Sequence, residues 1–138
     1  MREGVQQENL QVGDEMEDGT IYAGISPDTR KPMYAMPTDV SLTYTFNAAK
    51  DYVDDLNALD SFSHTDWRVP TKNELNVLYE NRNKGKLKGT FNETGSYPAG
   101  WYWSSSQGNT LNARAQRFSD GHPRYFYKSN VSSLRCVR

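Results

Sequence analysis

The chain has 138 residues, of which 24% are charged and 12% aromatic, and its formal net charge at pH 7 is −1. This length suits a single domain with its own hydrophobic core, and the aromatic content argues against intrinsic disorder. A slightly acidic chain also lacks the basic track that nucleic-acid binding requires, so we expect no nucleic-acid partner.

The charges are unevenly distributed. Residues 101–138 carry six basic side chains and one acidic one, whereas residues 1–100 carry ten basic and sixteen acidic ones. An ordinary solvated face explains this asymmetry, and the alternative is a C-terminal surface that prefers acidic partners. Cys136 is the only cysteine, which excludes a disulfide within the chain and argues against a structural zinc site.

Residues 1–13 are polar and contain no apolar run, so we expect neither a signal peptide nor a membrane span. We interpret them as a polar N-terminal arm, followed by a single domain over residues 14–138. In that domain, the β-branched and aromatic residues 20–25 predict a strand. Residues 31–36 can return as its partner after a turn.

Two amphipathic helices follow. Apolar residues at steps of three and four predict the first helix over residues 46–60, and these are Phe46, Ala49, Val53, Leu56 and Leu59. The second helix, over residues 71–82, begins with a capping box in which Thr71 is the N-cap and Glu74 reaches back to its backbone N–H.

The C-terminal third of the chain alternates between two kinds of segment. Residues 101–106, 116–121 and 132–138 have the character of short strands and turns. Residues 108–114 and 122–131 follow no helical or strand periodicity, but they are rich in the residue types of recognition surfaces. We predict one exposed, contiguous ligand-binding patch formed by Gly108, Asn109, Thr110, Leu111, Arg114, His122, Pro123, Arg124, Tyr125, Phe126, Tyr127, Ser129, Asn130 and Val131.

No catalytic or metal-binding constellation is visible, so we expect a non-enzymatic protein without a metal or cofactor. The two histidines stand in no metal-binding motif, and the serines at 104–106 lack the flanking glycines of a nucleophile elbow. The acidic run at residues 13–19 is no calcium loop, because Met16 stands at a ligand position.

Four motifs occur in order along the chain: WRVPTKNEL at 67–75, YWSSS at 102–106, FSDG at 118–121 and LRCVR at 134–138. Over residues 40–138 the chain resembles a bacterial and phage family of C-type-lectin-like domains, related at fold level to the formylglycine-generating enzyme. The resemblance implies an α+β fold of the C-type-lectin-like kind, with two helices packed on small twisted antiparallel sheets. We expect Trp67, Trp103, Phe118 and Cys136 to be buried.

Some members of this family are the variable proteins of diversity-generating retroelements, which the chain also resembles. Adenine mutagenesis there excludes Lys, Glu, Gln, Met and Trp from variable sites. These types make up 26 of the 138 residues, yet within 108–114 and 122–131 only Lys128 belongs to them. The resemblance implies a diversified display protein of a phage tail or prophage, made in the cytoplasm and acting on a virion or outside the cell. Its partner would be a cell-surface receptor, protein or glycan, and the N-terminal arm would contact a particle or tail protein.

Two alternatives stay open. The first is a bacterial adhesin of fixed specificity that binds acidic glycans through its basic C-terminal face. The second is an enzyme of the formylglycine-generating type, which the lone Cys136 disfavours because those enzymes use a pair of cysteines. The sugar-binding loops of calcium-dependent lectins, Glu-Pro-Asn or Gln-Pro-Asp, are absent from the sequence.

Overall fold

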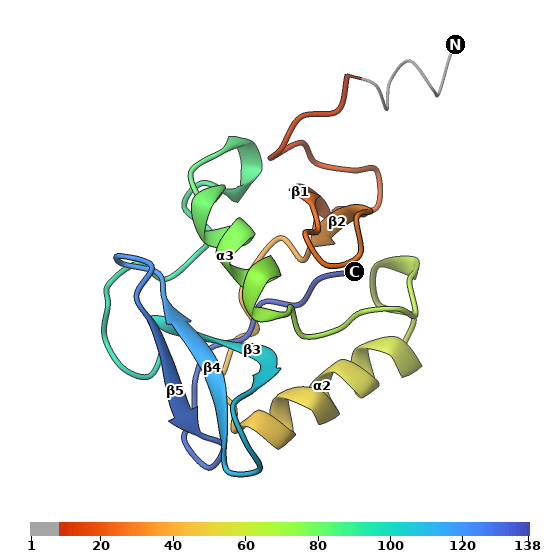
Figure 1. The fold of residues 1–138 in the computed structure, drawn as a ribbon. Helices are drawn as coiled ribbons and strands as arrows, with labels where there is room; N and C mark the ends of the chain where they lie inside the picture. The colour runs from red at the N-terminus through yellow and green to blue at the C-terminus, as the bar shows by residue number, and fades with distance from the viewer. Residues whose placement is uncertain (1–8) are drawn as a thin grey trace.

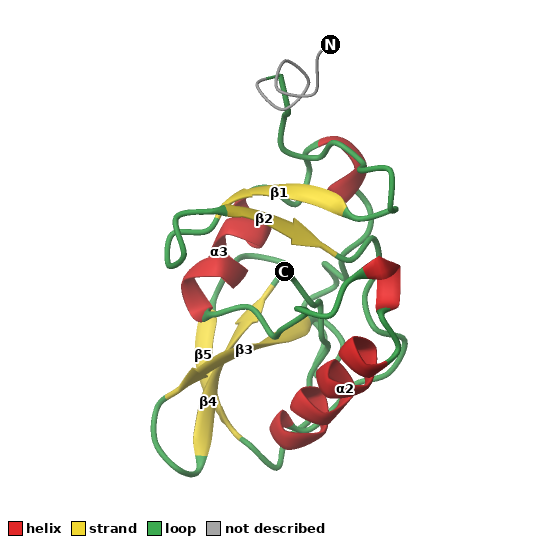
Figure 2. Ribbon diagram, turned by 90° about the vertical axis from the view of Figure 1, so that its right-hand side faces the viewer, coloured by secondary structure: helices red, strands yellow, loops and turns green. Residues whose placement is uncertain are grey.

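The computed structural model describes residues 9–138, and within them two α-helices and two small antiparallel sheets form an α+β fold (Figure 1). β1 (Ile21–Ile25) pairs with β2 (Pro32–Ala35) in the first sheet, as the sequence predicts. The second sheet has the order β3 (Trp101–Gln107), β4 (Asn112–Arg117), β5 (Pro123–Tyr127). The helix α3 contacts both sheets, and Figure 2 shows the two sheets at opposite ends of the molecule.

The helix α2 (Phe46–Ala58) confirms the predicted spacing, with a side-chain N-cap at Thr45 that accepts a hydrogen bond from the N–H of Ala48. Its buried stripe consists of Phe46, Ala49, Val53 and Leu56. Leu59 is the exception, because the helix ends at Ala58 and leaves this side chain exposed. The short 3-10 helix η1 (Ser61–Ser63) follows.

The capping box of α3 (Lys72–Glu80) is also confirmed. The hydroxyl of Thr71 accepts from the backbone N–H of Glu74, and the Glu74 carboxylate accepts from the N–H of Thr71. This carboxylate is fully buried and pairs with Arg68, while Ser26 donates a further hydrogen bond to it. Burial by itself would raise the pKa of Glu74, but these hydrogen bonds outweigh it and lower the pKa below its ordinary value.

Two hydrophobic clusters fill the molecule, and β3 supplies both. Trp101 and Trp103 point into the cluster around α2, whereas Tyr102 between them points into the cluster beneath α3, as strand alternation requires. The residues expected in the core, Trp67, Trp103, Phe118 and Cys136, are all buried. The 3-10 helix η2 (Gly85–Leu87) places Leu87 in the α3 cluster.

Residues 132–138 form no continuous strand, contrary to the prediction. They make isolated bridges instead: Ser132 with Tyr44, Ser133 with Tyr102, and Val137 with both Ala35 and Arg68. Their backbone groups thus pair with four separate places along the chain and not with one neighbouring strand. Residues 132–137 are buried in the interior of the domain.

The prediction of two irregular stretches was wrong in part, because β4 begins within the first stretch, at Asn112, and β5 (Pro123–Tyr127) lies within the second. The polarity of β5 does not alternate: only Phe126 among its residues is half-buried, and the other four are exposed. An edge strand that contacts the core through one side chain leaves no period-two signal in the sequence.

The expected N-terminal arm falls partly on residues 1–8, which lie outside the described residues. In the described part, Val12 packs against the α3 cluster, and the N–H of Gly13 donates to the carbonyl of Tyr22 at 2.8 Å. The carbonyl of Gly13 in turn accepts from Lys86. Residues 12–13 therefore contact the folded domain. None of the described helices is long and apolar enough to cross a membrane.

Candidate ligand-binding surface

The β4–β5 hairpin carries most of the residues expected to bind a ligand. Its register opposes Asn112 to Tyr127, Arg114 to Tyr125, and Gln116 to Pro123. Directly opposed residues share a face of a sheet, so these three pairs form one face, which we call the outer face. The alternate positions, Ala113, Ala115, Arg124 and Phe126, form the inner face.

The inner face attaches the hairpin to the core. Ala113 and Ala115 are fully buried, and the ring of Phe126 lies 4.9 Å from that of Trp101 and 5.5 Å from that of Tyr97. Phe126 is thus half-buried, because its ring fills space beside Trp101, and it is less exposed than the predicted patch requires.

The outer face presents aromatic side chains to solvent. Tyr125 is 46% exposed and Tyr127 is 65% exposed, although both are large rings. The guanidinium of Arg114 lies over the Tyr125 ring, 5.3 Å from its centroid. Such a cation–π contact orients both side chains without burying them.

The β3–β4 connection, residues 108–111, is exposed and turned by Asn109, whose side-chain oxygen accepts from the N–H groups of Leu111 and Asn112. Gly108 has less freedom than the prediction assumed. A Cβ atom there would collide with the side chain of Asn112 and the Tyr125 ring. A side chain at position 108 therefore requires the side chains of Asn112 and Tyr125 to move aside.

Beyond β5 the chain turns at once, and the N–H of Asn130 donates to the carbonyl of Tyr127 at 2.9 Å. Ser129 is exposed, whereas Asn130 and Val131 are partly covered. The N–H of Val131 donates to the hydroxyl of Tyr97, which ties this turn to the loop before β3.

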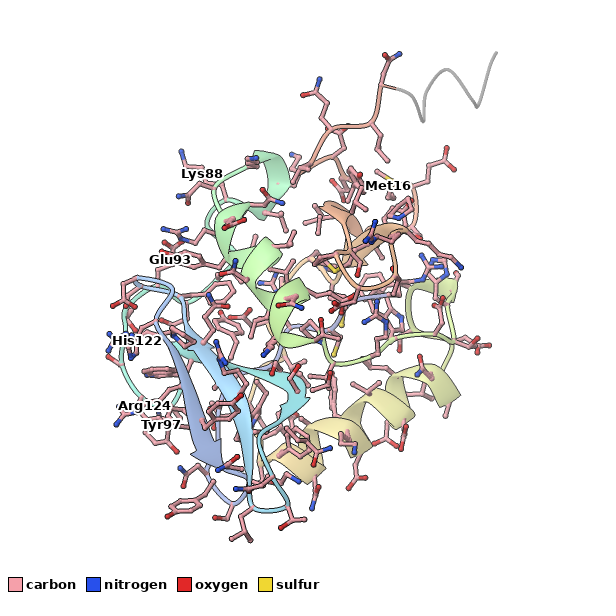
Figure 3. The ribbon with its side chains drawn as sticks, in the orientation of Figure 1. Met16, Lys88, Glu93, Tyr97, His122 and Arg124 are labelled. Carbon is pink, nitrogen blue, oxygen red and sulfur yellow. The ribbon has the colours of Figure 1, made fainter. Side chains whose placement is uncertain are left out.

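The predicted residues do not share one face. His122 and Arg124 are exposed on the side of β5 that faces Trp101 and Tyr97, as Figure 3 shows for the labelled side chains. Pro123, Tyr125 and Tyr127 lie on the outer face. A hollow of about 420 Å³ nevertheless involves residues of both faces, namely Asn112, Arg124, Tyr125, Phe126, Tyr127 and Asn130. The surface therefore continues around the edge of β5.

The family model of the Lcl C-terminal domain matches residues 26–138, which include α2, α3, β2 and the whole hairpin. The chain belongs to this family of C-type-lectin-like domains. Among curated protein sequences, no match to the chain was found.

The C-terminal excess of positive charge in this Lcl C-terminal domain does not all reach the surface. Arg135 is fully buried and binds Asp39, with Nη2 2.8 Å from Oδ1. Arg117 and Arg138 pair with Asp120 and Asp66. Three cations of the C-terminal third make no ion pair within residues 9–138: Arg114, Arg124 and Lys128.

Sequence reasoning missed one part of this surface. At the end of the outer face nearest to α3, Gln116 donates a hydrogen bond to Asn76, which lies 40 residues earlier in the chain. Lys72 lines the same pocket as these two residues. No local pattern links Lys72 to the hairpin, because only the fold brings them together. Within residues 9–138 no group of three or more His, Cys, Asp or Glu side chains could hold a metal ion.

Proposed function

We propose that this Lcl C-terminal domain is a non-enzymatic display protein, whose ligand contacts the outer face of the β4–β5 hairpin and its flanking turns. The observation that carries the proposal is the exposure of Tyr125 and Tyr127 on a strand anchored through Phe126. Large rings held rigidly in solvent are typical of protein-binding anchors, and Arg114 and Arg124 supply the charged groups that usually accompany them.

We further propose that a retroelement diversifies this surface. Lys128 is the one residue in the two stretches that adenine mutagenesis cannot produce, and it contacts residues outside these stretches. Its ammonium lies 5.1 Å from the centroid of the Phe46 ring and donates to the side chain of Gln107. Because residues outside the two stretches hold this lysine in place, we propose that position 128 is not diversified. Within the two stretches 108–114 and 122–131, all the other positions carry residue types that the mutagenesis permits.

The setting of Cys136 supports a non-enzymatic role over the formylglycine-generating alternative. The thiol is buried, and burial raises its pKa to about 12. A catalytic cysteine needs an accessible thiolate at neutral pH, which this environment disfavours. The proposed partner is a receptor on a target cell, reached when the domain is carried on a phage particle or released outside the cell.

Two experiments test this proposal. Sequencing of the flanking DNA should find a reverse transcriptase gene and an imperfect copy of the codons for residues 101–138. Separately, fluorescently labelled protein should bind a subset of a panel of intact bacterial strains. The double variant Tyr125→Ala/Tyr127→Ala should lose that binding while it keeps its melting temperature. Unchanged cell binding by the folded double variant would contradict the display surface.

A fixed-specificity adhesin for acidic glycans is the second candidate, because Arg114, Arg124 and Lys128 make no ion pair within the described chain. This function requires the cations but not the tyrosines. Retention on heparin that survives Tyr125→Ala/Tyr127→Ala and disappears in Arg114→Gln/Arg124→Gln would favour it over a diversified surface.

A further inference from the structure

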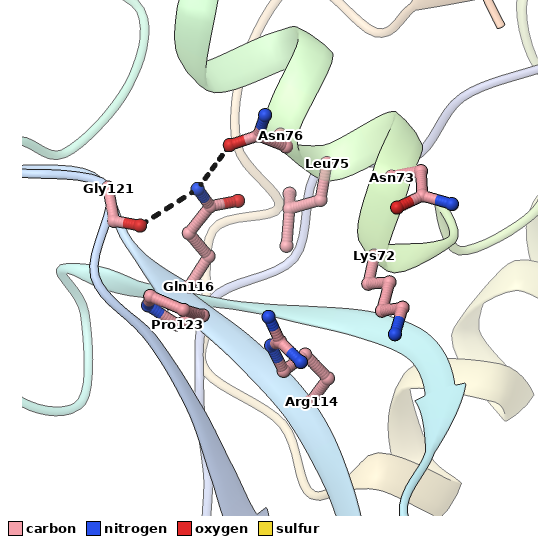
Figure 4. A pocket seen from close by; sticks show the side chains of 8 residues that line it. All are labelled: Lys72, Asn73, Leu75, Asn76, Arg114, Gln116, Gly121 and Pro123. Carbon is pink, nitrogen blue, oxygen red and sulfur yellow. Dashed lines mark hydrogen bonds between the residues drawn. The ribbon is translucent and has the colours of Figure 1, made fainter. Parts of the chain in front are cut away.

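A polar pocket of about 280 Å³ separates the first turn of α3 from the outer face of the hairpin (Figure 4). Its lining comes from both elements: Lys72, Asn73, Leu75, Asn76, Arg114, Gln116, Gly121 and Pro123. Only Leu75 and Pro123 contribute apolar side chains. The pocket is thus built to contact a polar group.

Two cations point into this pocket. Figure 4 shows the ammonium of Lys72 and the guanidinium of Arg114 turned toward the same space, from α3 and from β4. Neither pairs with a carboxylate within residues 9–138, and the pocket lining contains no acidic side chain. Two like charges that face one cavity repel each other, and an anion between them relieves this repulsion.

The nearby carboxylates are already engaged. Asp28 accepts hydrogen bonds from Thr71 and Asn73 at the start of α3. Asp120, in the turn after β4, is bound by both Nε and Nη2 of Arg117. The protein therefore supplies counter-charges on either side of the pocket but none within it.

Gln116 adds a hydrogen-bond acceptor of fixed orientation. Its side chain is 95% buried, and its amide nitrogen donates to Asn76 Oδ1 at 2.9 Å and to the Gly121 carbonyl at 3.0 Å. These two bonds determine which end of the amide is the nitrogen. Figure 4 shows the oxygen Oε1 on the side of the amide turned away from Gly121 and toward Leu75. A group that enters the pocket can donate a hydroxyl hydrogen to this oxygen.

The geometry points to a binding site for a hydroxylated carboxylate, that is, a sugar acid such as a uronic acid. Its carboxylate would lie between Lys72 and Arg114, whose planar guanidinium matches a planar carboxylate through paired hydrogen bonds. A neighbouring hydroxyl would donate to Gln116 Oε1. This inference deepens the proposed function and rests on it, because Arg114 joins the pocket to the display surface. Lys72 and Gln116 lie outside the two diversified stretches, whereas Arg114 lies within 108–114, so variation at Arg114 would change the affinity of the pocket for an acidic group.

The test is an NMR titration of the ¹⁵N-labelled full chain with sodium glucuronate, glucose or sodium sulfate at constant ionic strength. Glucuronate should shift the backbone amides of residues 72–76 and 114–121 in a saturable manner, and the other two should bind at least about tenfold more weakly. Lys72→Gln should weaken glucuronate binding about tenfold, because one charge-assisted contact is lost. The matched control is Lys88→Gln, which changes an exposed lysine beyond the opposite end of α3 (Figure 3).

Absence of saturable shifts with glucuronate overturns the pocket, and so does equal binding of glucose or sulfate. Shifts confined to other residues, or equal losses in Lys72→Gln and Lys88→Gln, also overturn it. These results are separable from the display proposal. The cell-binding loss in Tyr125→Ala/Tyr127→Ala tests the rings of the outer face, and neither ring lines the pocket.

Discussion

The ring of Phe126 lies 4.9 Å from the ring of Trp101, and this contact leaves the neighbours of Phe126, Tyr125 and Tyr127, facing away from the core. We predict that Phe126→Ala lowers the free energy of unfolding by about 2 kcal/mol, below the range for fully buried Phe because the ring is only half-buried. Tyr125→Ala and Tyr127→Ala should each change it by less than about 0.5 kcal/mol. Urea unfolding measures all three, and equal losses would remove the distinction between anchor and display residues.

Glu74 should make stability depend on acid pH. Its folded-state pKa lies below its ordinary value, so the ionised form is the one that the native protein favours. The stabilisation is fully present above the ordinary Glu pKa of 4.5 and is lost as pH falls through the lower folded value. We expect Glu74→Gln to cost about 1–3 kcal/mol at pH 7 and to flatten the decline below pH 4.5. Urea unfolding from pH 3 to pH 7 measures both, and an equally steep decline in the variant would assign it to other groups.

Cys136 should be inert in the native protein. Its thiol is fully buried with a pKa raised to about 12, so thiolate and access are both lacking at pH 8. A thiol-specific chromophoric reagent should react only after urea unfolding. Cys136→Ser should cost about 1–3 kcal/mol, because a hydroxyl is buried in an apolar cluster. Rapid labelling of the folded protein would show that the terminal segment opens readily.

Gly13 and Gly85 should be irreplaceable for a shared reason. A Cβ atom on Gly13 would lie 2.5 Å from the Lys84 carbonyl oxygen, and one on Gly85 would lie 2.6 Å from the Gly13 carbonyl oxygen. Gly89 also has a positive φ, of 78°, but has open space around it. Gly89→Ala therefore measures backbone strain alone, about 1 kcal/mol. Gly13→Ala and Gly85→Ala should lower the melting temperature further, and an equal effect of all three would exclude a steric contribution.

Local sequence patterns predicted the parts of the fold that are locally determined. The apolar stripe of α2 and the capping box at Thr71 depend on residues within one or two helical turns, so both could be predicted. The burial of Arg135 could not, because its partner Asp39 lies 96 residues away in the chain. The pocket beneath α3 escaped prediction for the same reason, since Lys72 and Gln116 meet only in the folded protein.

The exposure of the segment around Tyr125 was predicted, but its strand conformation was not. Residue types alone indicated the segment around Tyr125, because rings, Arg and Asn concentrate there. They did not reveal that β5 is an edge strand with Phe126 turned inward, since that depends on where Trp101 and Tyr97 lie. Composition therefore indicated which segment is exposed, whereas packing decides which side chains within it face solvent.

The bridges of residues 132–138 have a consequence for the order of folding. Val137 pairs with Ala35, about 100 residues earlier in the chain, and with Arg68, about 70 residues earlier. Both contacts close long loops, so we expect them to form late in folding. During synthesis these bridges cannot form until residues 132–138 have left the ribosome. The β4–β5 hairpin, in contrast, pairs residues close in sequence and can form early. Changes to the hairpin's solvent-facing residues should therefore leave the folding step in which residues 132–138 form their bridges unaltered.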